Sequence, residues 1–175
     1  MICADGWGAV TMTGVAARVG VSRQAIYKQI PGKTALGEAV IARETDRMLT
    51  GVEDQLRACE DPVAAITAAA GYVLDAAASP LIKAMLTDGR SGTPDLLPLV
   101  TTRPELVMGR AITTVAAAAR DRFSDLPVDS QTIDRASEMI VRLTFSHLIQ
   151  ATGPADEALT QIRVLTEAIL AYYLT

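Results

Sequence analysis

The sequence predicts an all-helical protein. Half of its 175 residues are apolar, alanine is very frequent and only 4% are aromatic, a composition that favours helices over sheets. Apolar residues recur every three or four positions in most segments, which is the period of an amphipathic helix. At this length the chain can form one or two small domains with a real core.

The most informative stretch is residues 6–36, where two short helices are predicted on either side of a tight turn. Gly20 ends the first of them, because glycine enters the left-handed conformation without steric cost. Pro31-Gly32 ends the second, and a third helix begins directly after it. The hydroxyl side chains that can cap the two short helices are Thr11, Thr13 and Ser22. This pattern predicts a helix-turn-helix, which points to DNA.

The two faces of these short helices carry different residue types. The apolar set expected to face inward or to fill the space between the helices is Val15, Ala16, Val19, Val21, Ile26 and Ile30. The polar set left outward, able to contact base edges or phosphates, is Arg23, Gln24, Lys28 and Gln29. Lys33 begins the third helix, where a lysine can meet a phosphate beside the positive end of the helix dipole.

These residues resemble the N-terminal signature of the tetracycline-repressor (TetR) family of bacterial regulators. The matching positions are Gly6-Trp7, Thr11, Val15-Ala16, Gly20-Val21-Ser22, Ile26-Tyr27, Pro31, Lys33 and Ala35-Leu36. The resemblance implies that Thr11, Tyr27 and Lys33 hold phosphates. It implies that the residues facing bases are Arg23, Gln24, Ala25, Lys28 and Gln29.

The resemblance also implies a domain organisation, and the sequence departs from the family pattern at two places. Residues 1–36 would be the DNA-binding domain, with its first helix largely missing because only five residues precede Gly6. Residues 37–175 would be a helical effector-binding and dimerisation domain. Ile30 stands where the family usually has an aromatic residue, and it keeps the apolar role.

The charge distribution fits a DNA-binding head on an acidic body. Residues 1–35 hold four basic residues against Asp5 alone, a formal charge of +3, although the whole chain carries −4. A locally basic head provides an electrostatic footprint for DNA, and a dimer would double it. The two cysteines, Cys3 and Cys59, are too few for a disulfide framework and have no metal-ligand neighbours. With no cofactor motif, no apolar run long enough for a bilayer and no signal-peptide layout, we expect a cytoplasmic protein without membrane, metal or cofactor.

The rest of the chain is predicted to be helical. A long amphipathic helix over 33–57 is followed by one that Asp61-Pro62 begins and another that begins at Ser79-Pro80. Residues 88–93 form a Gly-rich loop, and a short helical piece over 95–100 is interrupted by Pro98. The last three helices are expected over about 104–123, from Asp129 or Ser130 to about 151, and from Asp156 nearly to the end.

The last two helices are the candidates for a homodimer. Two broad apolar helices joined by a short turn can pair with their symmetry mates as a four-helix bundle, and the TetR resemblance implies the same. The alternative is that each faces its own core. The predicted interface residues are Ile140, Leu143, His147, Leu159, Ile162, Leu165, Ile169, Tyr172 and Tyr173.

The resemblance further implies a small-molecule pocket in the body whose ligand releases the operator, which requires different ligand affinities for the two states. The predicted apolar lining is Met85, Leu86, Leu97, Leu106, Met108, Ile112, Phe145 and Leu148. The predicted polar contacts are Arg103, Arg142 and His147. Each has a structural alternative: a loop contact before Pro104, an ion pair with Glu138, and a core or interface position. The expected effector is apolar, with any negative group facing an arginine.

Together these features predict a repressor that a small apolar molecule releases from its operator. Two other classes of function compete with this prediction. An enzyme is disfavoured, because the sequence has no nucleophile elbow, phosphate-binding loop or zinc pair and only one histidine for acid–base chemistry. A helical dimeric binding or scaffold protein with a non-functional DNA head is the alternative that the short first helix favours.

Overall fold

The computed structural model describes residues 2–87 and 96–173, and every regular element in these ranges is an α-helix, so the all-helical prediction is confirmed. The helices are α1 (Ile2–Asp5), α2 (Met12–Val19), α3 (Arg23–Gln29), α4 (Lys33–Ala58), α5 (Pro62–Ala76), α6 (Pro80–Thr87), α7 (Leu97–Thr102), α8 (Met108–Arg122), α9 (Ser130–Ile149) and α10 (Ala155–Tyr173). The predicted Gly-rich loop at 88–93 lies outside the described residues. The chain divides into two compact units.

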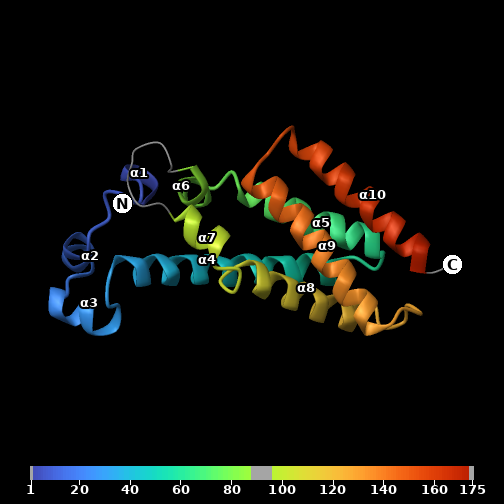
Figure 1. Cartoon of the computed structure of the whole chain (residues 1–175), viewed down its shortest axis with the longest axis horizontal. Coiled ribbons are helices and arrows are strands. Elements are labelled where there is room, and N and C mark those ends of the chain that lie inside the picture. Colours follow the sequence, from blue (N-terminus) through green and yellow to red (C-terminus); the bar gives the residue numbers. More distant parts are fainter. Residues whose placement is uncertain (1, 88–95, 174–175) are drawn as a thin grey trace. The chain divides into compact units, whose positions relative to one another are not determined.

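The first unit combines Met1–Thr45 with Ala78–Val107. Within it α2 packs on α3, α1 on α6, and α6 on α7 (Figure 1). Gly37 of α4 lies under Trp7, Leu96 and Leu99, and a Cβ atom at Gly37 would lie 2.8 Å from a methyl group of Leu96. This grouping differs from the division at residue 36 that the sequence suggested, because α6 and α7 belong to the same compact unit as the helix-turn-helix.

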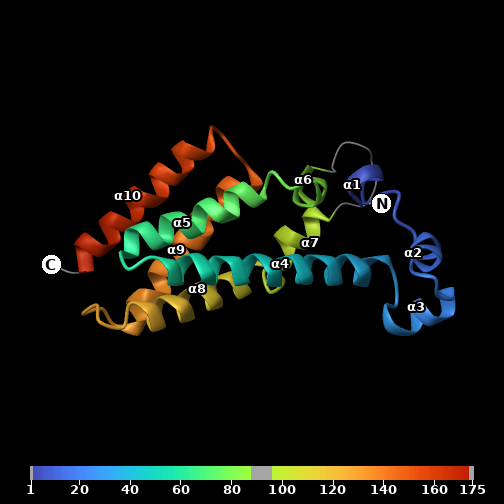
Figure 2. The same ribbon diagram turned by 180° about the vertical axis from the view of Figure 1, so that it is seen from behind.

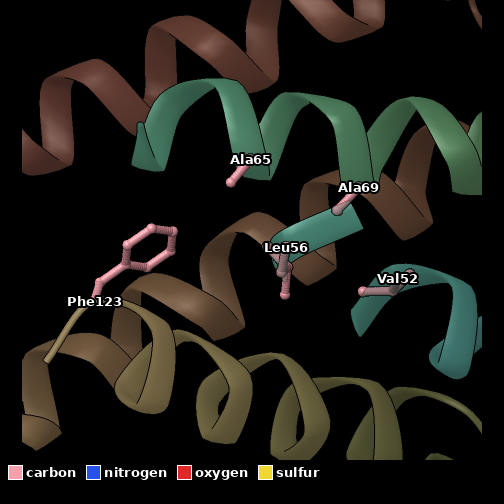
Figure 3. Packing of buried hydrophobic residues seen from close by; sticks show 5 residues of the cluster. All are labelled: Val52, Leu56, Ala65, Ala69 and Phe123. Carbon is pink, nitrogen blue, oxygen red and sulfur yellow. The ribbon is translucent and has the colours of Figure 1, made fainter. Parts of the chain in front are cut away.

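The second unit combines Asp46–Ala77 with Met108–Thr175. In it α8 runs along α9, and α10 packs on α5 and α9 (Figures 1 and 2). Figure 3 shows the centre of one core cluster, made of Val52, Leu56, Ala65, Ala69 and Phe123. The two alanines on α5 leave room for the larger side chains of α4 and for the ring of Phe123. A second cluster has Ala70, Ile140 and Ile162 at its centre.

Helix boundaries agree with the sequence except at two prolines. Pro98 lies in the first turn of α7 and does not interrupt a helix. Backbone N–H groups in the first turn have no partner within the helix, so the N–H that proline lacks is not needed there. Pro104 does not open the next helix: residues 104–107 form a turn, with the Leu106 N–H donating to the Arg103 carbonyl at 3.0 Å. The helix begins four residues later, at Met108.

Among the residues that the structure describes, no single helix is long and apolar enough to cross a membrane, and α5 and α6 meet that criterion only when they are counted together.

Candidate nucleic-acid interface

Side-chain caps and a left-handed glycine fix the two short helices of the head. Thr11 Oγ1 accepts a hydrogen bond from the Gly14 N–H at 3.0 Å, and Ser22 Oγ accepts one from the Ala25 N–H at 3.1 Å. Gly20 has φ of 76° and its N–H donates to the Ala16 carbonyl, which confirms the predicted turn. Each cap satisfies a backbone donor that the first turn of a helix leaves free. Thr13 was also expected to cap, but it lies inside α2 and is exposed.

Four apolar residues of the head are buried. Trp7, Val10, Met12 and Ala16 are buried, each with at most 6% of its surface exposed. Met12 and Ala16 share a face of α2 because they are four residues apart. The interior role expected of Val19 and Val21 is wrong, since they are 66% and 44% exposed.

Helix α3 is held on one side only. Ile26 and the residue that follows the helix, Ile30, are partly buried, as predicted, and no residue of α3 itself is fully buried. A short helix that places so little apolar surface in the core leaves its other side chains in solvent.

Lys33 has a structural contact that the sequence did not reveal. Its Nζ donates to the Gly8 carbonyl at 3.0 Å and lies 5.2 Å from the ring centroid of Trp7. The side chain therefore ties the segment before α2 to the start of α4, with a cation–π contribution. An ammonium group has three donors, so this contact leaves donors available for a phosphate.

Apart from Lys33, which is partly buried, the residues expected to contact DNA are all exposed. The exposed set is Thr11, Thr13, Arg18, Ser22, Arg23, Gln24, Ala25, Tyr27, Lys28 and Gln29. Among the residues that the structure describes, none bonds or pairs with the side chains of Arg18, Arg23, Gln24, Lys28 or Gln29. Arg18, at the end of α2, is a further exposed cation. The prediction from the sequence counted it only in the net charge of residues 1–35. A basic surface with free amide and guanidinium donors can contact phosphates and base edges.

Comparisons with known proteins agree with this geometry. A model of the bacterial tetracyclin repressor C-terminal domain matches residues 61–168, and a model of the bacterial regulatory proteins of the tetR family matches residues 2–40. The chain belongs to the TetR family. TetR proteins are regulators of transcription and not enzymes, so the exclusion of catalysis from the sequence agrees with the family.

Two named TetR proteins are similar to this chain. The HTH-type transcriptional regulator AlkX of Mycobacterium tuberculosis (strain ATCC 25618 / H37Rv) is 31% identical over 145 residues, which are 81% of this chain and 66% of that protein. The crystal structure of the TetR family repressor AlkX from Dietzia sp. strain DQ12-45-1b, implicated in biodegradation of n-alkanes, matches with a TM-score of 0.75. That match covers 98% of this chain and 90% of the other at 21% identity, which supports the shared fold.

The predicted effector residues of this TetR protein divide between the two units. The first unit holds Met85, Leu86, Leu97, Arg103 and Leu106, and the second holds Met108, Ile112, Arg142, Phe145, His147 and Leu148. Arg142 takes its structural alternative, whereas Arg103 makes an ion pair with α4 that the sequence did not suggest. Arg103 pairs with Glu38 at 3.0 Å, and Arg142 pairs with Glu138 one turn away at 2.7 Å.

Cavities in the second unit give a different candidate for an effector site. One lies between α5, α8, α9 and α10 and is almost wholly apolar, with lining residues that include Ile66, Val115, Phe123, Ile133, Ile140 and Leu170. Another lies at the turn between α9 and α10 and includes His147 and Leu148 of the predicted set. His147 Nε2 is buried and has no hydrogen-bond partner among the described residues.

The predicted dimer residues on α9 and α10 occupy buried, partly buried and exposed positions. Ile140 and Ile162 belong to the core of their own protomer, where Ile162 is fully buried, so the structure corrects their assignment to an interface. Leu143, Leu159, Leu165 and Ile169 are partly buried against the same cluster. The large apolar side chains that these helices leave exposed are Met139, Val164 and Tyr172.

Two further observations concern charge and metals. The pKa of Asp129 lies below its ordinary value, chiefly because the Thr132 N–H donates to this carboxylate, which caps α9. In the described ranges no group of three His, Cys, Asp or Glu side chains is placed to hold a metal ion.

Proposed function

We propose that this TetR protein is a cytoplasmic repressor that binds double-stranded operator DNA as a homodimer and is released by a small apolar molecule. The observation that carries the DNA-binding part is the exposed, unpaired set of side chains on α3, fixed by its Ser22 cap. In a helix-turn-helix the second helix enters the major groove, and a dimer contacts two half-sites about one helical turn apart. Thr11, Tyr27 and Lys33 are proposed to hold phosphates.

The test is fluorescence anisotropy of the purified protein with the DNA upstream of its own gene, at two salt concentrations. We expect specific binding that weakens steeply as salt rises, because phosphate contacts release counterions. Tyr27→Ala should weaken binding while leaving the folded dimer intact. Asp75→Asn, an exposed change on α5, is the matched control. No sequence preference in any fragment of the surrounding genome would favour a scaffold protein with a non-functional DNA head.

The apolar cavity of the second unit supports an uncharged, apolar effector. Its lining includes few polar groups, and one of them, the Thr132 hydroxyl, already bonds to Asp129. A site of this composition discriminates by shape and apolar contact, not by charge. The Dietzia relative is implicated in biodegradation of n-alkanes, and we therefore propose a hydrocarbon-like effector for this chain.

Release of a labelled operator by n-alkanes and by a cationic amphiphile of equal length tests this effector. We expect the n-alkane to release the operator and the amphiphile to have no effect. Ala136→Phe should fill the cavity, which Ala136 lines, and abolish the response while operator affinity stays unchanged. Release by the cation alone, or an unchanged n-alkane response in Ala136→Phe, would refute the site. The residues Met85, Leu86, Leu97, Leu106, Met108, Ile112 and Phe145 remain the alternative lining.

We propose that the dimer forms through the exposed faces of α9 and α10. Val164 and Tyr172 lie on the outer face of α10, 53% and 78% exposed, and Met139 lies on α9. Large apolar side chains that a protomer leaves exposed are candidates for an interface. Val164→Arg should shift the sedimentation coefficient to that of a monomer. Thr50→Arg, which adds the same charge at an exposed position of α4, should leave the sedimentation coefficient unchanged. Dimers of unchanged affinity in Val164→Arg would exclude this surface.

A further inference from the structure

The geometry of α3 separates the side chains that would face the centre of a DNA major groove from those that would face its edges. Only Ile26 of this helix is partly buried, so its direction defines the inner side. Successive residues of an α-helix are rotated by about 100°, with 3.6 residues per turn. Residues two positions before and after Ile26 therefore point about 160° away from it. These residues are Gln24 and Lys28.

The remaining exposed polar residues of α3 lie to the sides. Tyr27 is about 100° from Ile26, and Arg23 and Gln29 are only about 60° from it on opposite sides. Side chains at these angles reach the walls of the groove more readily than its floor, because Ile26 marks the side of α3 that faces its own protein. Their donors are suited to phosphates, which fix register but carry no sequence information.

We infer that Gln24 and Lys28 are the base-reading pair, and that each operator half-site presents an adenine to Gln24 and a guanine to Lys28. A glutamine amide matches the N6 donor and N7 acceptor of adenine, and a lysine matches the O6 and N7 acceptors of guanine. Both side chains are exposed and make no bond to another described residue. This inference rests on the proposed function, because it specifies what the DNA-binding helix recognises.

The spacing of the two bases follows from the helix. Gln24 and Lys28 are four residues apart, about 6 Å along the axis at 1.5 Å per residue. Base pairs repeat every 3.4 Å or so along DNA, so the adenine and the guanine lie about two base-pair steps apart. Arg23 would contact the backbone and not a guanine, which narrows the larger base-contacting set that the family resemblance implies.

The experiment begins with in vitro selection of the full chain on a pool of randomised duplexes. The selected duplex is then changed at one base pair at a time, symmetrically in both half-sites, and the affinity of each duplex is measured. We expect Gln24→Ala to lose discrimination at one A·T position only, and Lys28→Ala at one G·C position only. The expected loss per half-site is about 5- to 150-fold, the factor that one bidentate base contact contributes.

Base analogues and a control variant sharpen the assignment. Replacing the selected adenine with 7-deazaadenine removes its N7 acceptor and keeps base pairing, so it should weaken wild-type binding but not Gln24→Ala binding. Arg23→Ala should lower the affinity for all duplexes by one common factor. Gln131→Ala, at an exposed position of α9, should leave affinity and discrimination unchanged. The inference is overturned if Arg23→Ala or Gln29→Ala removes the discrimination while Gln24→Ala and Lys28→Ala keep it. Failure of the wild type to select any sequence would instead refute the proposed function, and the inference with it.

Discussion

Gly51→Ala should destabilise the second unit, although alanine is the better helix former. A Cβ atom at Gly51 of α4 would lie far inside van der Waals contact with Cζ and the hydroxyl oxygen of Tyr72. Tyr72 packs on the core cluster around Leu56, so the ring must be displaced. Such overpacking typically costs about 1–3 kcal/mol, and the helix propensity of alanine offsets about 1 kcal/mol of it. We expect a net loss of up to about 2 kcal/mol.

The sign of the effect should reverse once the ring is removed. In a Tyr72→Ala background the steric conflict is gone, and Gly51→Ala should stabilise by about 1 kcal/mol. The four proteins form a double-mutant cycle whose coupling energy should be about 1–3 kcal/mol. Urea unfolding followed by circular dichroism measures each free energy of unfolding, at one protomer concentration because the proposed dimer would add to the stability.

A matched control separates this contact from a general effect of glycine. A Cβ atom at Gly71, inside α5, would meet only Leu159 at 3.7 Å, an ordinary contact. Gly71→Ala should therefore stabilise by about 1 kcal/mol with or without Tyr72. If Gly51→Ala stabilised the wild type as much as Gly71→Ala does, the reasoning from the close approach of Tyr72 would be refuted.

Three further changes test the core, the head and one helix cap. Leu56→Ala, at a position only 1% exposed, should cost about 2–5 kcal/mol in urea unfolding because it leaves a cavity; a smaller loss would mean that the neighbouring helices collapse into the space. Lys33→Ala should weaken DNA binding and also speed amide exchange around Gly8, since it removes the bond to the Gly8 carbonyl; unchanged exchange would leave Lys33 with a DNA role alone. Asp129 has a lowered pKa, so its contribution to stability is present at neutral pH and lost as the pH falls below about 4. Asp129→Asn should lack this acid-dependent step in the pH dependence of unfolding, and an identical pH profile would contradict it.

The parts of the fold that the sequence predicts are those that depend on neighbouring residues. The Thr11 and Ser22 caps and the Gly20 turn each involve residues within four positions of one another. Their residue types therefore show in the sequence as clearly as in the structure. The glycines of α4 could not be read in this way. Gly37 and Gly51 lie in a continuous helix, and only contacts with residues distant in the sequence explain why a larger side chain would not fit there.

Amphipathic periodicity identifies an apolar face but not what covers it. The pattern of α9 and α10 fits both a dimer interface, which the family resemblance favours, and a protomer core. The structure places Ile162 in the core and leaves Val164 exposed two residues later, on a different side of the same helix. Apolar residues that stay exposed after the protomer has packed are the ones that can join two protomers. The burial of each residue of α10 therefore separates core residues from interface candidates, which the sequence pattern alone could not do.

Lys33 shows that a residue proposed to bind DNA can also have a structural role. Its position suggested a phosphate contact at the start of a helix, and the structure adds a bond to Gly8 and a contact with Trp7. Loss of DNA binding in Lys33→Ala therefore has two possible causes, a missing phosphate contact and a loosened head. Tyr27 is 43% exposed on a helix with little buried surface, so Tyr27→Phe removes one hydroxyl with little effect on packing. A loss of affinity in Tyr27→Phe that is equal for all duplexes would be the cleaner evidence for a phosphate contact, because sequence-independent contacts lower affinity uniformly.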